Sequence, residues 1–196
     1  MRKFGLLAAA AALTVATPSL AATVVNIDGL ANASIDGSNA VDVALAAGTY
    51  TVTFTQDQFT AFSRFSGEAG CDANGGNCSQ GFENSARIVV GGVTILFGDG
   101  AATGGIGPIA GGGYFDSAAR SFANAAQYST TFTLANAGTA SFYLYDDFLG
   151  DNRGGVSLSV AGVPEPAAWA LMILGFGAVG GAMRRRQSVA AKVRFA

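Results

Sequence analysis

Thr49-Tyr50-Thr51-Val52-Thr53-Phe54-Thr55 is the stretch that decides the fold. Tyr50, Val52 and Phe54 alternate with threonines, so one face of the extended chain is apolar and the other carries hydroxyl groups. This period of two is typical of a half-buried strand. The stretch therefore predicts a β-rich domain.

The same alternation returns along the chain between turns rich in Gly and Asn. Within the longest such segment, Gly91-Gly92 interrupts the run as a turn or a bulge. Seven or eight short strands of this kind predict an all-β fold, an antiparallel, jelly-roll-like β-sandwich. Besides 49–55, strands are predicted at 23–28, 41–45, 87–97, 131–134, 141–145 and 156–160.

Two segments depart from this pattern. Residues 98–113 are rich in Gly, Ala and Thr and are expected to form a loop, and they lack the Gly-Lys-Ser/Thr ending of a phosphate-binding loop. Residues 115–128 carry Phe and Ala at helical spacing, with Asp116 or Ser117 as a cap. One short helix is therefore expected to pack on the sandwich.

The N-terminus has the features of a secretory signal peptide. Arg2 and Lys3 precede an apolar run from residue 4 to 15, and small residues around Ala21 and Ala22 offer a cleavage site. The apolar run is too short to span a membrane. We expect residues 1–22 to be removed during export and residues 23–162 to form the domain outside the inner membrane.

The C-terminus, residues 163–196, carries a second signal. Pro164-Glu165-Pro166 precedes an apolar run, 167–183, and then Arg184, Arg185 and Arg186. Seventeen apolar residues reach roughly 25 Å as a helix, close to the thickness of a hydrocarbon core. They predict a single transmembrane helix with Trp169 at the outer interface and the arginines in the cytoplasm. A buried helix followed by a basic tail is the alternative.

These residues, in this order, resemble the PEP-CTERM sorting domain in its PEPxxWA form. The resemblance covers Pro164, Glu165, Pro166 and Trp169, the glycine-containing apolar run and the three arginines. It implies an exported Gram-negative protein and an exosortase partner, a membrane cysteine transpeptidase that recognises the Pro-Glu-Pro and removes the tail. It also implies a transient membrane anchor, followed by release to the cell surface or extracellular matrix.

Without its two signals the chain is strongly acidic. Residues 23–162 hold 12 acids, four arginines and no lysine, a net charge of −8 against −2 for the whole chain. Such a surface repels nucleic acid and favours cations such as calcium. We therefore expect no nucleic-acid partner.

The chain has no histidine, which bears on catalysis. A Ser-His-Asp or Cys-His arrangement and a His-ligated metal centre are both excluded. Paired carboxylates of a glycosidase remain chemically available, but no spacing singles out a pair. The sequence predicts that the protein is not an enzyme and has no catalytic residues.

Cys71 and Cys78 are the only cysteines, and the six residues between them are suited to a turn. In an oxidising compartment such a pair is expected to form a disulfide, worth about 2 to 3 kcal/mol in the chain-entropy model. A redox-active or metal-binding pair is the less favoured alternative, because the spacing is not CxxC.

The segment 145–155 concentrates oxygen ligands. Asp146, Asp147, Asp151 and Asn152 place carboxylates and an amide on one loop, and calcium prefers such oxygens. The competing interpretation is a hairpin loop whose Asp and Asn side chains cap their own backbone. Both interpretations stay open at this point.

A weaker resemblance concerns the same loop and the strand after it. Gly150-Asp151-Asn152, Gly154 and the strand 156–160 are similar to the terminal loop and strand of bacterial calcium-dependent galactose lectins, which also have a cysteine pair. The resemblance implies Asp147, Asp151 and Asn152 as calcium ligands; no other cofactor is expected. Four phenylalanines near the cysteines could stack on sugars or pack in the core: Phe59, Phe62, Phe65 and Phe82.

Two functions follow as expectations. The first is a surface or matrix protein sorted by an exosortase and associated with exopolysaccharide or biofilm. The alternative is a calcium-dependent carbohydrate-binding module.

Overall fold

The computed structural model describes residues 21–66, 70, 78–98, 113–164 and 166–187, and within the last range it describes the side chains of 170–184. The chain divides into two units. One spans Leu20–Pro164, and the other contains the helix α2 (Pro166–Gln187).

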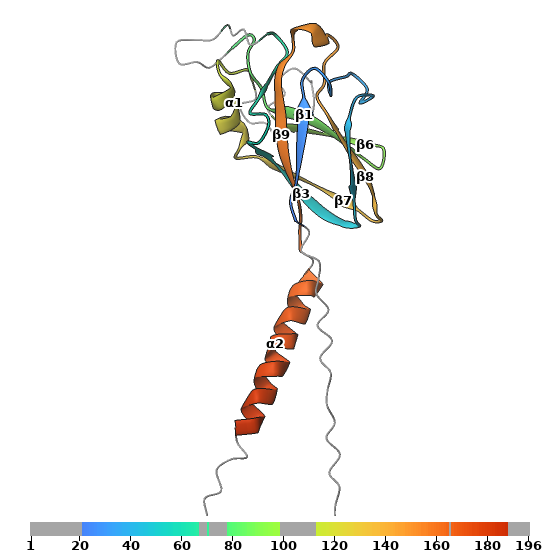
Figure 1. Cartoon of the computed structure of the whole chain (residues 1–196), viewed down its shortest axis with the longest axis vertical. Coiled ribbons are helices and arrows are strands. Elements are labelled where there is room, and N and C mark those ends of the chain that lie inside the picture. Colours follow the sequence, from blue (N-terminus) through green and yellow to red (C-terminus); the bar gives the residue numbers. More distant parts are fainter. Residues whose placement is uncertain (1–20, 67–69, 71–77, 99–112, 165, 188–196) are drawn as a thin grey trace, which may run out of the picture. The chain divides into compact units, whose positions relative to one another are not determined.

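Two antiparallel sheets make up the first unit (Figure 1). The first sheet has the order β1 (Thr23–Asp28), β9 (Arg153–Gly162), β3 (Gly48–Thr55), β7 (Ser129–Leu134), and the two-residue β4 (Phe62–Ser63) also pairs with β9. The second sheet has the order β2 (Val41–Leu45), β8 (Gly138–Tyr143), β5 (Ser85–Val90), β6 (Val93–Gly98). The predicted all-β fold with antiparallel sheets is confirmed.

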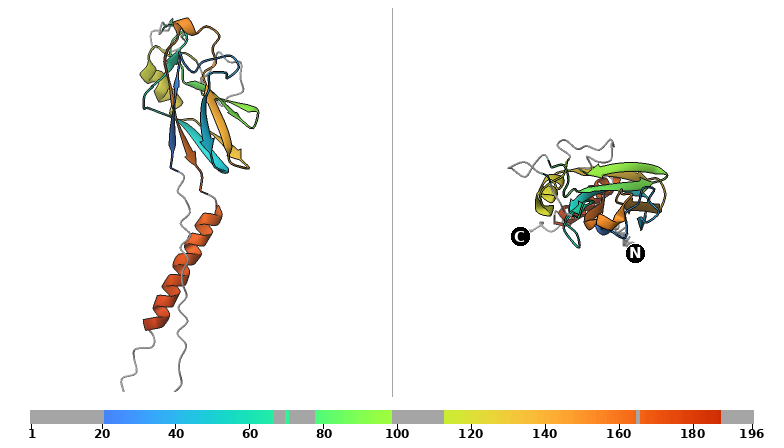
Figure 2. Two further views of the ribbon diagram at one scale, coloured as in Figure 1. Left: turned by 45° about the vertical axis from the view of Figure 1, so that its right-hand side comes forward. Right: turned by 90° about the horizontal axis from the view of Figure 1, so that it is seen from above.

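The chain crosses repeatedly between the two sheets. Apart from β3–β4 and the β5–β6 hairpin, consecutive strands always lie in different sheets. Such crossing is the pattern of double-sheet, jelly-roll sandwiches. Figure 2 shows the sheets as two layers.

The alternation in β3 explains how the layers meet. Tyr50, Val52 and Phe54 are buried while the residues between them are half-buried, as a period of two requires. Phe54 stacks on Phe97 of the opposite sheet, with ring centroids 4.4 Å apart. The main core therefore lies between the two sheets and draws residues from both.

The other predicted elements are found close to their expected positions. Gly91 and Gly92 have φ values of 57° and 80° and join β5 to β6, so the interruption is a turn rather than a bulge. The short helix is α1 (Ala118–Ala125), with Ser117 at the N-cap position. The Ser117 hydroxyl donates to Asp116 instead of capping the helix. The strand β4 was not predicted, because two residues show no periodicity.

The predicted helix at 167–183 is present as α2, Pro166–Gln187. Its predicted role as a transmembrane helix is not supported. Among the residues whose side chains are described, no helix is both long and apolar enough to cross a membrane.

Three further expectations fall on residues outside those described. They concern the signal peptide, whose residues 1–20 are not described, the glycine-rich loop at 99–112, and Cys71. The Cys71–Cys78 disulfide therefore stays a prediction.

Candidate functional site

The first candidate site is the junction between the sandwich and α2. The strand β9 ends at Gly162, and the amide of Val163 donates a further hydrogen bond of 2.8 Å to the carbonyl of Thr49. Pro164 follows directly, and Pro166 begins α2. Glu165 lies outside the described residues.

The two prolines fit these positions for physical reasons. Pro164 has no N–H and cannot extend the hydrogen-bond ladder of β9, so the sheet ends where the motif starts. Pro166 suits the first position of a helix, where its missing N–H would have no partner in any case. Every strand in the described part of the chain therefore precedes the Pro-Glu-Pro, and loss of the segment after it removes none of them.

The remaining sorting residues are only partly described. Arg184 is exposed, whereas the side chains of Trp169, Arg185 and Arg186 lie outside the described part of α2. Their predicted roles in sorting stay predictions.

The second candidate site is the acidic segment between β8 and β9. These two strands lie in different sheets, so the segment crosses the end of the sandwich and is not the hairpin loop suggested above. A short 3-10 turn at Leu149–Asp151 shapes it. Along this path the side-chain oxygens differ in their burial and in their hydrogen-bond partners. The residues concerned are Asp146, Asp147, Asp151 and Asn152.

Asp146 and Asn152 are both buried, and each has one polar atom bonded and one without a partner. Asp146 Oδ1 accepts from the amides of Asp147 (2.8 Å) and Phe148 (3.3 Å), which is the backbone capping expected of a structural aspartate. Asn152 Nδ2 donates to the carbonyl of Gly29 at 2.7 Å. In the described part of the chain, Asp146 Oδ2, Asp151 Oδ1 and Asn152 Oδ1 are buried without a hydrogen-bond partner.

The positions of these oxygens do not test the prediction that the segment binds calcium. Asp147 is exposed, while Asp151 is half-buried and Asn152 fully buried. Among the described residues, no group of three or more acidic, His or Cys side chains is arranged to hold a metal ion. Calcium binding by Asp147, Asp151 and Asn152 stays a prediction.

A pocket of about 270 Å³ opens beside the acidic segment. It lies between the loop after β1 and the segment before β9. The sequence does not indicate the contribution of the first loop, because its Ser, Asp and Asn residues do not differ from those of an ordinary turn. The lining residues are Ala33, Ser34, Ile35, Asp36, Ser38, Asn39, Asp146, Asp147 and Leu149.

A buried ion pair lies close to Asp146. Arg64 Nε donates to Glu83 Oε1 at 2.8 Å, and the Ser85 hydroxyl donates to Glu83 Oε2 at 3.2 Å. Burial raises the pKa of Glu83 above its ordinary value, and the positive charge of Arg64 opposes that rise. The negative charge of Asp146 raises the pKa of both partners, although burial and the pairing between them have larger effects.

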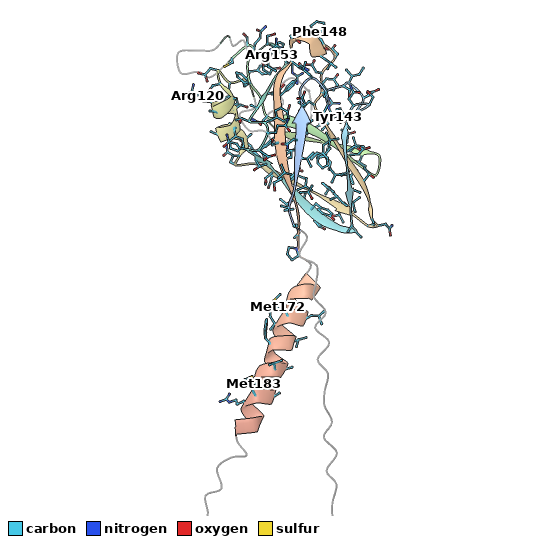
Figure 3. All side chains as sticks on the ribbon, viewed as in Figure 1. Arg120, Tyr143, Phe148, Arg153, Met172 and Met183 are labelled. Carbon is cyan, nitrogen blue, oxygen red and sulfur yellow. The ribbon has the colours of Figure 1, made fainter. Side chains whose placement is uncertain are left out.

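The phenylalanines near the cysteines are not exposed platforms. Phe62 is fully buried in the core, while Phe59, Phe65 and Phe82 are half-buried. Phe65 packs edge-on against Tyr114, with ring centroids 5.3 Å apart. Within the sandwich, the ring of Phe148 is exposed; it is 67% accessible and lies in the acidic segment (Figure 3).

Comparison with known protein families identifies the sequence motif at the junction between the sandwich and α2. No curated protein and no solved structure is similar enough to the chain to count as a match. Residues 162–187 match the PEP-CTERM protein-sorting motif, beginning with the last residue of β9 and ending with the last residue of α2. The chain therefore carries a PEP-CTERM protein-sorting motif, which implies export, a transient membrane anchor and sorting to the cell surface by an exosortase.

Proposed function

We propose that this is a non-enzymatic surface or matrix protein, delivered by exosortase processing of its tail and associated with exopolysaccharide or biofilm. The observation that carries the proposal is the motif at 162–187, which starts where the sandwich ends. The exosortase could therefore remove the tail without disturbing any described strand of the sandwich.

The surface of α2 supports a transient anchor. Its large apolar side chains are exposed on all sides of the helix, as a helix that is covered by lipid or by another protein requires. Leu171, Ile173, Leu174 and Phe176 are each about two-thirds or more accessible. Water is a poor environment for such a helix, so removal of the tail also favours a soluble product.

Substitution of the motif tests this proposal. Pro164→Ala combined with Pro166→Ala is expected to leave the protein full length in the membrane fraction of the producing cell. The matched control is Pro108→Ala, a proline substitution outside the motif. Unchanged release of the double variant to the cell surface would contradict the proposal.

Calcium-dependent carbohydrate binding is the second candidate function. The observation that favours it is the set of three buried oxygens without partners on the acidic segment, at Asp146, Asp151 and Asn152. Calorimetry with calcium, followed by galactosides or purified exopolysaccharide, tests it. Absence of heat in both titrations would remove this candidate.

A further inference from the structure

The pocket beside the acidic segment lies at one particular end of the sandwich. The strands β1 and β9 are antiparallel neighbours, with Thr23 opposite Val160 and Asp28 opposite Gly155. The loop after β1 and the segment before β9 therefore meet at the same end, where Figure 3 shows Phe148 and Arg153. The start of β1 and the end of β9 lie at the other end.

This geometry separates the pocket from the point where the tail leaves the domain. The ten residues of β9 span about 30 Å at 3.3 Å per residue. A domain held at the cell surface through its C-terminus has the pocket on the side away from that attachment.

The lining of the pocket carries negative charge without a counterpart. Asp36, Asp146 and Asp147 contribute three carboxylates, and no lysine or arginine is among the lining residues. Hydrogen bonds from Ser38 lower the pKa of Asp36, which favours its charged form. Further oxygens come from Ser34, Ser38 and Asn39.

Asp146 provides an independent indication of a ligand. It is only 6% accessible, its Oδ2 atom has no hydrogen-bond partner, and the ion pairs of the described residues do not include it. The nearby Arg64 is already paired with Glu83. Its other oxygen, Oδ1, accepts from the amides of Asp147 and Phe148. A buried carboxylate oxygen without a partner is costly, and a cationic ligand would offset that cost.

The other features of the pocket restrict the kind of cation. The described acidic residues form no group of three or more side chains arranged to hold a metal ion. Ile35 and Leu149 add apolar lining, and Phe148 follows Asp147 with its ring exposed. Aromatic rings attract cations and cover the apolar face of a sugar ring.

We propose that this pocket binds an ammonium-bearing sugar, such as an amino-sugar unit of a glycan outside the cell. Asp147 and Asp36 would pair with the ammonium group, the Ser and Asn side chains would bond hydroxyl groups, and Phe148 would cover the sugar ring. The proposal rests on the proposed function, which puts the domain outside the cell, where it would contact the glycan. Binding itself does not depend on processing by the exosortase.

Calorimetry on the full-length chain in detergent tests the proposal, with glucosamine as the probe below the pKa of its amine. Glucose and N-acetylglucosamine are matched probes of the same ring without the charge. Glucosamine is expected to bind about tenfold more tightly than either. Equal binding of the three sugars, binding of calcium chloride alone in this pocket, or no heat with glucosamine would each overturn the proposal.

Two variants locate the site. Asp147→Asn and Phe148→Ala change exposed side chains, so the fold is expected to persist, and each is expected to weaken glucosamine binding about tenfold. Asp116→Asn removes one negative charge from an exposed pair near α1 and is expected to leave binding unchanged. An equal loss in all three variants would indicate general attraction to an acidic surface and would overturn the site. Processing of the Pro164 and Pro166 variant tests sorting separately.

Discussion

The Arg64–Glu83 pair is the residue-scale feature on which the sandwich depends most clearly. The Glu83 side chain is fully buried and that of Arg64 nearly so. The pair joins the residue after β4 to the segment before β5, which the backbone bridge between Phe62 and Glu83 also brings together. The backbones of Phe62 and Glu83 exchange two hydrogen bonds, of 2.9 and 2.7 Å. A buried pair of this kind is costly to break, because one charge is left without a partner.

Removal of Arg64 is therefore expected to destabilise the domain strongly. Arg64→Met leaves Glu83 buried without its cation, and the free energy of unfolding is expected to fall by about 3 to 5 kcal/mol. Arg120→Met breaks the exposed pair with Asp116, in which the two atoms are 3.2 Å apart. This substitution should change the free energy of unfolding by less than about 1 kcal/mol. Denaturant unfolding of both variants measures the difference. Similar values for the two would contradict the importance of the buried pair.

The pKa of Glu83 gives a pH dependence with a defined sign. Burial raises it above the ordinary 4.5, so the folded state binds this proton more tightly than the unfolded state. The contribution of Glu83 to the free energy of unfolding is therefore largest below pH 4.5 and declines as pH rises through the folded-state pKa. The difference in unfolding free energy between the wild type and Glu83→Gln should change across this range. A difference that is constant with pH would contradict the raised pKa.

Most strands were predictable because they carry their own period-two pattern, whereas the two-residue β4 carries none. β1 and β2 lie where the sequence placed them, and Gly91-Gly92 separates two strands as a turn. The order of strands in the sheets was not predictable, since β9 pairs with β1 about 130 residues earlier in the chain. No local pattern specifies such a partner.

The two candidate sites also differ in how far the sequence could predict them. The tail motif is contiguous and could be recognised from residue types alone. The pocket joins the loop containing Asp36 to the segment containing Asp147, which are more than 100 residues apart. They meet because β1 pairs with β9 and because Ala33 pairs with Leu144. Phe148 was missed for a related reason, because nothing in the sequence distinguishes an exposed ring from the buried Phe62.

Truncation tests where the folded element ends. A chain ended after Pro164 keeps all of β9 and the Val163–Thr49 hydrogen bond, so its unfolding should match that of the sandwich in the full chain. A chain ended after Ser159 loses the buried Val160 and its pairing with Val52, and should be at least about 2 kcal/mol less stable. Thermal unfolding compares them. Equal stability of the two truncated chains would show that the end of β9 contributes little.

Along the whole chain, a folded β-sandwich is followed by a C-terminal sorting motif. The domain of residues 23–162 holds its core between two sheets, and the motif at 162–187 starts at its last strand residue. The acidic charge of the domain, −8, is carried outward with it. Under the proposed function, processing separates the folded sandwich from an apolar helix.

The most direct test of this account is the intact mass of the protein recovered from the surface of the producing cell. We expect a chain that starts at Ala22 or Thr23 and has lost α2 with Arg184, Arg185 and Arg186. The double variant Pro164→Ala, Pro166→Ala should instead give a membrane-bound chain that keeps α2. A surface-recovered wild-type chain whose mass still includes α2 would contradict removal of the tail during sorting.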